Sequence, residues 1–67
     1  MQTKTIQVSE LNDQTKLELL NQTLTEIDGV KSVQMDTDDH VITIKFETPA
    51  SLNNLEKAVY DLGYTVL

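Results

Sequence analysis

The spacing of apolar residues changes its period along the chain, and this change constrains the fold more than any other feature. From Thr3 to Val8 apolar and polar residues alternate, which is typical of a strand with one buried face. Apolar residues then recur every three or four positions, the spacing of one helix face, at Leu17, Leu20, Leu24 and Ile27. Gly29 follows where a left-handed residue would end that helix. Asn12 or Asp13 would cap its start.

The second half of the chain repeats these signals. Residues 30–36 and 41–47 alternate again, and the polar turn 37–40 between them predicts a β-hairpin. Ser51 is a good N-cap for a second helix, which Gly63 would end. The apolar stripe of this helix is Leu52, Leu55, Ala58, Val59 and Leu62. Residues 64–67 are expected to form a last short strand.

The order strand, helix, strand, strand, helix, strand predicts one α+β domain over residues 1–67. It is the ferredoxin-like βαββαβ plan, a four-stranded antiparallel sheet with two helices on one face. The core would lie between the helix stripes and the inner faces of the strands, at Ile6, Val8, Val33, Met35, Ile42, Ile44, Phe46, Tyr64 and Val66. Leu19 falls off its helix stripe, so we expect it to be partly exposed.

Composition argues against several classes of function. The 67 residues include no Cys, which excludes thiolate chemistry, and a single His. With no Arg and a net charge of −6, the surface repels phosphate backbones, so nucleic-acid binding is not expected. No catalytic constellation or phosphate-binding loop is present, and we predict that the chain is not an enzyme. Short apolar runs and the absence of a signal-peptide pattern predict a cytoplasmic protein without membrane insertion.

The helix and turn residues also carry a family resemblance. The pattern Leu17-x-x-Leu20-x-x-x-Leu24-x-x-Ile27-x-Gly29-Val30-x-x-Val33, followed by Ser51-Leu52-x-x-Leu55-x-x-Ala58-Val59-x-x-Leu62-Gly63-Tyr64, resembles the heavy-metal-associated, copper-chaperone-like family. The resemblance runs from Lys4 to Leu67. The family's Met-Thr-Cys-x-x-Cys motif falls here on Leu11-Asn12-Asp13-Gln14-Thr15-Lys16. Asp13 therefore stands at the first cysteine position and Lys16 at the second, and Leu11 keeps the apolar anchor.

The resemblance implies a metal site whose ligands are gone. Members of the family bind copper(I) with these two cysteines, because soft thiolates suit a soft ion. A hard carboxylate and a protonated amine cannot replace them, so we expect no metal or other cofactor at Asp13 and Lys16. Two interpretations of the pair are open. Either it forms an ion pair that closes the loop where the cation would sit, or Asp13 is a helix cap and Lys16 a solvated side chain.

A second cluster, Asp36-x-Asp38-Asp39-His40, has metal-ligand chemistry. Together with Asp13, these residues are the candidates for the alternative hypothesis, a protein that binds hard cations through carboxylates. The spacing matches part of a calcium loop, but the strand expected over 41–46 cannot curl around an ion. Turns select Asp for local hydrogen bonds, so a polar hairpin turn is the favoured interpretation. A lone His does not make a zinc site.

The preferred hypothesis is a small accessory protein that docks to a partner in metal homeostasis or transport. Family members pass copper through this loop to transporter domains of the same fold. The resemblance thus implies a similar partner, a metal-transporting ATPase domain, and the negative charge also suits another protein with a basic surface. The predicted docking residues are Leu11, Asn12, Asp13, Gln14, Thr15, Lys16 and Tyr64. With Leu11, the off-stripe residues Leu19 and Tyr60 would add an exposed apolar patch beside the loop.

Overall fold

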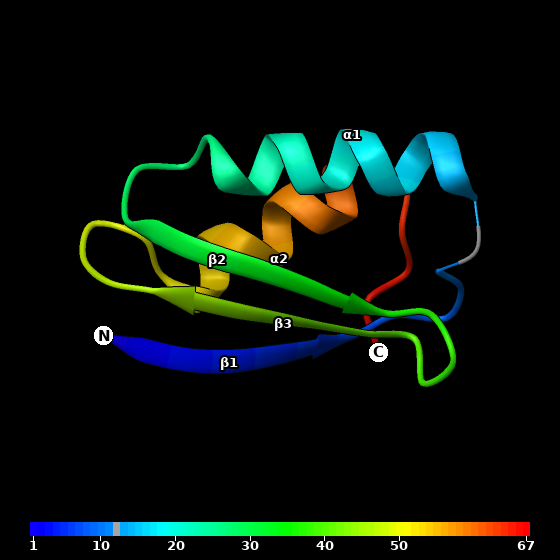
Figure 1. Ribbon diagram of the computed structural model, residues 1–67, viewed down its shortest axis with the longest axis horizontal. Helices are drawn as coiled ribbons and strands as arrows, with labels where there is room; N and C mark the ends of the chain where they lie inside the picture. Colours follow the sequence, from blue (N-terminus) through cyan, green and yellow to red (C-terminus); the bar gives the residue numbers. More distant parts are fainter. Residues whose placement is uncertain (12) are drawn as a thin grey trace.

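The computed structural model describes residues 1–11 and 13–67 and has both helices on one face of an antiparallel sheet (Figure 1). In chain order the elements are β1 Gln2–Gln7, α1 Gln14–Thr25, β2 Val30–Asp36, β3 Val41–Phe46 and α2 Leu52–Asp61. The sheet has three strands in the order β1-β3-β2, so β3 is the central strand. Neither described helix is long and apolar enough to cross a membrane.

The predicted fourth strand over residues 64–67 is not present among the described residues. Val66 instead makes one isolated antiparallel bridge with Val8. Two backbone hydrogen bonds flank it, from Ser9 N to the Thr65 oxygen (3.0 Å) and from Leu67 N to the Gln7 oxygen (2.8 Å). The ladder between β1 and β3 ends at Gln7. The last segment therefore runs beside only the final residues of β1 and the start of the loop, too few for a ladder.

Helix α1 ends earlier than predicted. Its last residue is Thr25, so Ile27 lies beyond the helix, partly buried, instead of on the helix stripe. The Thr25 hydroxyl donates to the carbonyls of Asn21 (2.8 Å) and Gln22 (3.1 Å), a local bond that competes with helix continuation. Gly29 is left-handed as expected, with φ +102, but serves the turn into β2. Its carbonyl accepts from Glu47 N at 2.8 Å.

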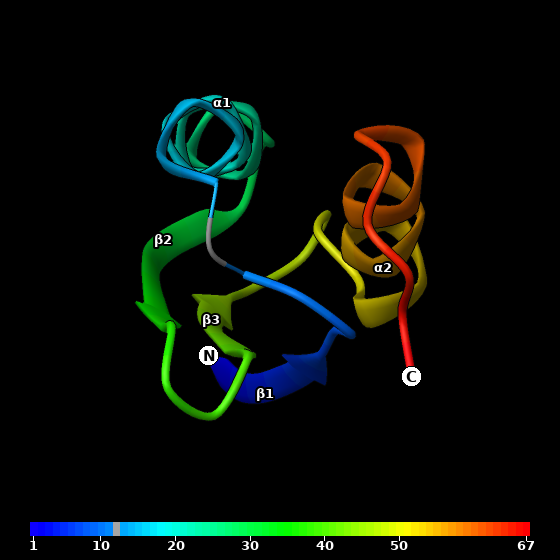
Figure 2. The ribbon, with the colours of Figure 1, turned by 90° about the vertical axis from the view of Figure 1, so that its right-hand side faces the viewer.

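The core lies between the sheet and the two helices, which sit side by side above it (Figure 2). Most predicted positions are confirmed, and Phe46 in particular faces inward with 1% exposure. Val33, Met35 and Val66 are only partly buried. Leu19 is 50% exposed, as its place off the stripe indicates. The buried set is Ile6, Val8, Leu11, Leu20, Leu24, Ile42, Ile44, Phe46, Ala50, Leu55, Val59 and Tyr64.

Candidate functional site

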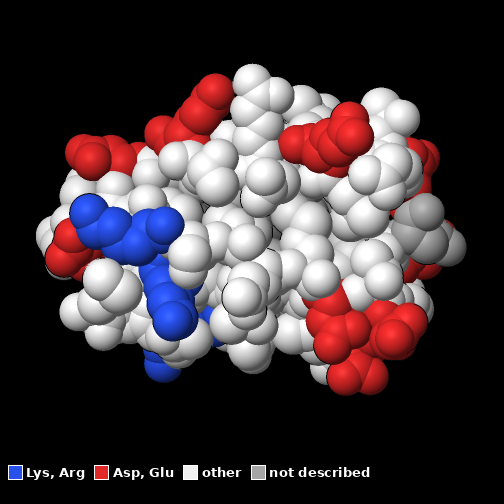
Figure 3. Space-filling model, in the orientation of Figure 1, with Lys and Arg blue, Asp and Glu red and all other residues white. Residues whose placement is uncertain are grey.

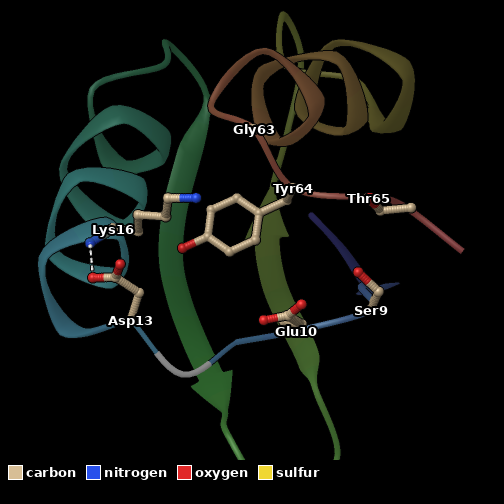
Figure 4. A pocket seen from close by; sticks show the side chains of 7 residues that line it. All are labelled: Ser9, Glu10, Asp13, Lys16, Gly63, Tyr64 and Thr65. Carbon is tan, nitrogen blue, oxygen red and sulfur yellow. Dashed lines mark hydrogen bonds between the residues drawn. The ribbon is translucent and has the colours of Figure 1, made fainter.

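Asp13 is the N-cap of α1. One of its carboxylate oxygens accepts from the backbone N–H groups of Thr15 (3.1 Å) and Lys16 (3.3 Å). These are two of the free donors that every helix start presents, and a short acidic side chain satisfies them well. The structure thus confirms that Asp13, which stands at the first cysteine position of the family motif, is a helix cap (Figure 4).

Lys16 does not pair with Asp13. The described residues hold two ion pairs, Lys31–Glu47 (2.9 Å) and Lys57–Asp61 (3.3 Å), and neither involves the loop. Figure 4 shows the Lys16 ammonium directed toward Tyr64, away from the Asp13 carboxylate. A Cβ placed on Gly63 would lie 3.9 Å from Lys16 Nζ. The ion-pair interpretation is therefore wrong, because Asp13 is committed to the backbone and Lys16 crosses to the end of α2.

Tyr64 is buried, with 8% exposure, beside these two residues. Its hydroxyl is the one buried side-chain polar atom in the described part of the chain that has no hydrogen-bond partner. Burial raises the pKa of the Tyr64 phenol above its usual range, and the nearby Asp13 carboxylate adds to the rise. The Tyr64 hydroxyl has a donor and lone pairs that no described residue uses.

An open pocket of about 220 Å³ lies between the loop, the start of α1 and the segment after α2. We call it the loop pocket. Figure 4 shows the residues that these three segments contribute, with the Tyr64 ring between Lys16 and Glu10. Its charged groups are two carboxylates and one ammonium, and its neutral polar groups are the Tyr64 phenol and the Ser9 and Thr65 hydroxyls. The lining residues are Ser9, Glu10, Asp13, Lys16, Gly63, Tyr64 and Thr65.

The structure places the predicted docking residues in three different situations. Asp13, Lys16 and Tyr64 meet at the loop pocket, and Gln14 and Thr15 are exposed beside it on the first turn of α1. Asn12 lies outside the described residues. Leu11 is completely buried, which corrects its assignment to the surface: it anchors the loop from beneath and cannot touch a partner. Leu19 and Tyr60 are exposed, at 50% and 69%, so the predicted patch loses one member.

The sequence analysis did not assign four of the pocket residues to a site: Ser9, Glu10, Gly63, which was predicted only as a helix stop, and Thr65. Ser9 and Glu10 stand just before the loop, and their polar character gave no signal beyond that of a break after β1. Thr65 comes from the other end of the chain. The bond between Ser9 N and the Thr65 oxygen brings these segments together, and that pairing is a long-range contact.

The acidic hairpin turn has a local explanation. One Asp36 carboxylate oxygen accepts from the backbone N–H groups of Asp38 and Asp39, both at 3.0 Å. His40 adopts a left-handed backbone, φ 56, and its carbonyl accepts from Val8 N at 3.0 Å. No group of three or more metal-ligating side chains comes together among residues 1–11 and 13–67. The turn is thus held by its own hydrogen bonds, as favoured from the sequence.

Comparisons with known proteins identify the family. No family model matches the chain. The solved structure of the CsoZ metallochaperone superimposes with a TM-score of 0.92 at 30% identity, covering 98% of this chain and 96% of that one. The chain belongs to the heavy-metal-associated, copper-chaperone-like family.

Two further proteins resemble the chain, one over part of its sequence and one in fold alone. The "COP-associated protein" of Helicobacter felis is 36% identical over 39 residues, which span 58% of this chain and 59% of that protein. The yeast copper transporter domain CCC2A shares the fold at 12% identity, with a TM-score of 0.90 and coverage of 100% and 96%. As a heavy-metal-associated domain this chain is atypical, because it has no cysteine for a Cys-x-x-Cys motif.

Proposed function

We propose that this chain is a cytoplasmic accessory protein of metal homeostasis that docks to a partner and carries no copper itself. One observation carries the proposal: the chain has the metallochaperone fold over 98% of its length and contains no cysteine. At the former ligand positions stand a helix cap, Asp13, and an ammonium, Lys16. Neither replaces a thiolate for copper(I). A non-enzymatic role fits the metallochaperones that share this fold.

The proposed docking surface is the end of the molecule that carries the loop. Gln14 and Thr15 are exposed there, and Asp13, Lys16 and Tyr64 form the adjoining pocket. The proposed partner is a metal-transporting ATPase domain. The yeast copper transporter domain with this fold supports that choice, and the net charge of −6 favours a partner with a basic surface.

The test is a titration of the isotope-labelled chain with the metal-binding domain of the copper-transporting ATPase of the same organism. We expect amide shifts confined to the first turn of α1 and to residues 63–65. Replacing exposed Gln14 and Thr15 with arginine should abolish them by adding bulk and positive charge. The matched control places the same two changes at exposed Gln22 and Thr25, at the far end of α1, and should leave binding intact.

Metal titrations complete the test. Copper(I), zinc and calcium at micromolar concentration should leave the amides of residues 11–16 unshifted. A copper(I) response confined to this loop would contradict the proposal. A response of the acidic turn to calcium at that concentration would favour the hard-cation alternative instead. Equal weakening by the Gln14/Thr15 and Gln22/Thr25 variants would show that docking does not use the loop.

A further inference from the structure

The Tyr64 hydroxyl suggests that the loop pocket binds a ligand. It is buried, it has no partner among the described residues, and it faces the pocket in Figure 4. A buried polar group without a hydrogen bond is uncommon in a folded protein and costs free energy. A water molecule takes up about 30 Å³ of liquid, and the pocket measures about 220 Å³. The space therefore admits a group larger than one water.

We propose that the loop pocket receives the guanidinium group of an arginine side chain from the docking partner. This inference rests on the proposed function and names the chemistry of the contact. The lining includes side chains that can accept from such a group: the Glu10 and Asp13 carboxylates, the Ser9 and Thr65 hydroxyls and the Tyr64 oxygen. A guanidinium has five N–H donors in a planar fork, which can serve several acceptors together.

The protonation states fit a cationic ligand. Asp13 uses one carboxylate oxygen for the helix cap, so its second oxygen has no role in the cap. The pocket lining carries two negative groups and one positive group, a formal charge of −1. The Tyr64 phenol is neutral, so its oxygen accepts an N–H without adding a charge. An anionic ligand would instead meet a lining whose formal charge is also negative.

The surroundings of the pocket also favour a basic ligand. The bond between Val8 N and the His40 oxygen places the acidic turn of residues 36–40 at the end of the molecule where the loop begins. In the face shown in Figure 3 acidic side chains lie at both ends, but the visible Lys side chains gather at the end opposite the loop. Exposed Leu19 and Tyr60 lie on the two helices that border this end, one turn from Lys16 and Gly63 respectively. They offer apolar surface for the stem of an arginine.

The effect of Lys16 on binding distinguishes a cationic ligand from an anionic one. Its ammonium extends toward Tyr64 and would repel an incoming cation. The side chain is exposed and flexible, so it can turn out to solvent as the guanidinium enters. Removing its charge should therefore strengthen binding of an arginine side chain. A pocket for an anion would respond in the opposite direction.

The experiment titrates the isotope-labelled chain with the blocked peptide acetyl-Gly-Arg-Gly-amide at low salt. A matched peptide carries citrulline, which keeps the shape of arginine and lacks its charge. We expect saturable shifts of the Glu10, Lys16 and Thr65 amides with a Kd on the order of millimolar. The citrulline peptide should bind at least about tenfold more weakly, since hydrogen bonds to charged groups are the stronger ones.

Three variants locate the contact. Tyr64→Phe should weaken the arginine peptide about fivefold by removing one acceptor. Glu10→Gln should weaken it by a similar factor, and Lys16→Gln should tighten it about twofold or more. Glu26→Gln, at the far end of α1, is the matched control for the loss of one carboxylate and should change nothing. The far-ultraviolet spectrum of each variant verifies that it is folded.

Three results would overturn the inference. The first is equal binding of the arginine and citrulline peptides. The second is the absence of a saturable shift up to about 50 mM peptide, a range that covers very weak binding. The third is weaker binding of the arginine peptide after Lys16→Gln. If the arginine peptide fails while the transporter domain still shifts the loop, the guanidinium contact is wrong and the docking function stands. If the transporter domain also fails, the proposed function is wrong as well.

Discussion

At the scale of single residues, Asp13 and Lys16, which stand at the two cysteine positions of the family motif, have different structural roles. Asp13 has a structural role in the helix cap, whereas the Lys16 side chain makes no hydrogen bond or ion pair with the described residues. Tyr64 combines burial with an unpartnered hydroxyl. The three residues are neighbours in space, and stability measurements on single substitutions separate their roles.

Asp13→Ala should destabilise the protein by about 1 kcal/mol, the usual cost of removing a helix N-cap. Two backbone N–H groups lose their acceptor in this variant. Asp13→Asn keeps an acceptor oxygen, so it should lose much less. Lys16→Ala should change stability by less than about 0.5 kcal/mol, as for an ordinary surface position. Urea unfolding measures all three, and equal losses for Asp13→Ala and Lys16→Ala would contradict these separate roles.

Tyr64 should make stability depend on pH in the alkaline range. Burial first, and the Asp13 charge second, raise its pKa in the folded state above that of the unfolded chain, about 10. Above that pH the unfolded chain loses its phenolic proton first, so the contribution to stability present below pH 10 falls as pH rises. Comparing unfolding free energies across pH 9 to 11, roughly spanning that pKa, tests this.

The controls for the alkaline loss are two tyrosine variants. Tyr64→Phe should flatten the decline relative to the unmodified chain. Tyr60→Phe, at a side chain that is 69% exposed, should not. Since lysines also titrate in this range, only the difference between the variants is informative. The same slope in both variants would show that Tyr64 does not cause the decline.

At the scale of elements, the two turns that follow the helices look alike in sequence and differ in structure. Both contain a left-handed glycine, Gly29 at φ +102 and Gly63 at φ +97. Gly63 directly follows the C-cap of α2, as predicted. Gly29 lies three residues beyond the C-cap of α1 and packs against the end of β3. The surroundings of each glycine therefore decide how well a side chain would be tolerated.

Gly29→Ala should be the more damaging of the two glycine substitutions. Its Cβ would collide with the Glu47 carbonyl oxygen and lie 2.9 Å from Ala50 N, both of them backbone atoms. We expect a loss above about 3 kcal/mol, from overpacking and backbone strain together. Gly63→Ala meets only the Lys16 Nζ, at 3.9 Å, and should lose about 1 kcal/mol from the left-handed backbone alone. Chemical denaturation of both variants measures the difference.

The loop and the start of α1 should tolerate cysteines at the two ligand positions of the family motif. Asp13→Cys combined with Lys16→Cys places two thiols at the i, i+3 spacing at a helix N-terminus, where their pKa falls. We expect the double variant to keep its far-ultraviolet spectrum and to gain copper(I) binding, measured by competition with a colorimetric chelator. The control, Asp13→Ser with Lys16→Ser, should bind none. A folded double-cysteine variant without affinity would mean that the motif does not fall on residues 11–16.

At the scale of the whole molecule, charge is unevenly distributed along the long axis. Three of the five lysines occupy strand positions near the end of the sheet away from the loop. Lys45 stands opposite Thr3 and Ser32, Lys4 opposite Ile44, and Lys31 pairs with Glu47. The acidic turn lies at the loop end. The chain therefore has a polarity that its net charge alone does not express, and this polarity would orient a basic partner toward the loop.

This polarity predicts which carboxylates steer association. Asp38→Asn with Asp39→Asn should lower the association rate of the transporter domain and reduce its dependence on salt. Asp36 is left in place because its carboxylate holds the turn. The control, Glu26→Gln with Asp28→Asn, removes the same charge at the far end of α1 and should have a smaller effect. Stopped-flow measurements at low and physiological salt compare them, and equal effects would argue against oriented steering.

The sequence by itself determined both helices, the first three strands, their order and most of the core. Hydrophobic period, caps and glycine stops are local signals, so the start of α2 at Ser51 and the inward face of Phe46 followed from them, while the start of α1 was narrowed to Asn12 or Asp13. The absence of cysteine was equally plain. The end of α1 was misjudged, because Ile27 continues the helical spacing while the turn at Gly29 is fixed by its bond to Glu47.

Only the tertiary structure decided what surrounds Asp13 and Lys16. The last segment pairs with the residues after β1 through one bridge, too short a contact for the predicted fourth strand. That contact brings Thr65 beside Ser9 and encloses Tyr64 next to the loop. The pocket is therefore made of residues more than 50 positions apart, which no local pattern relates. The tertiary structure also shows that Leu11 is buried and not at the surface, since burial depends on what packs over a residue and not on its position in the chain.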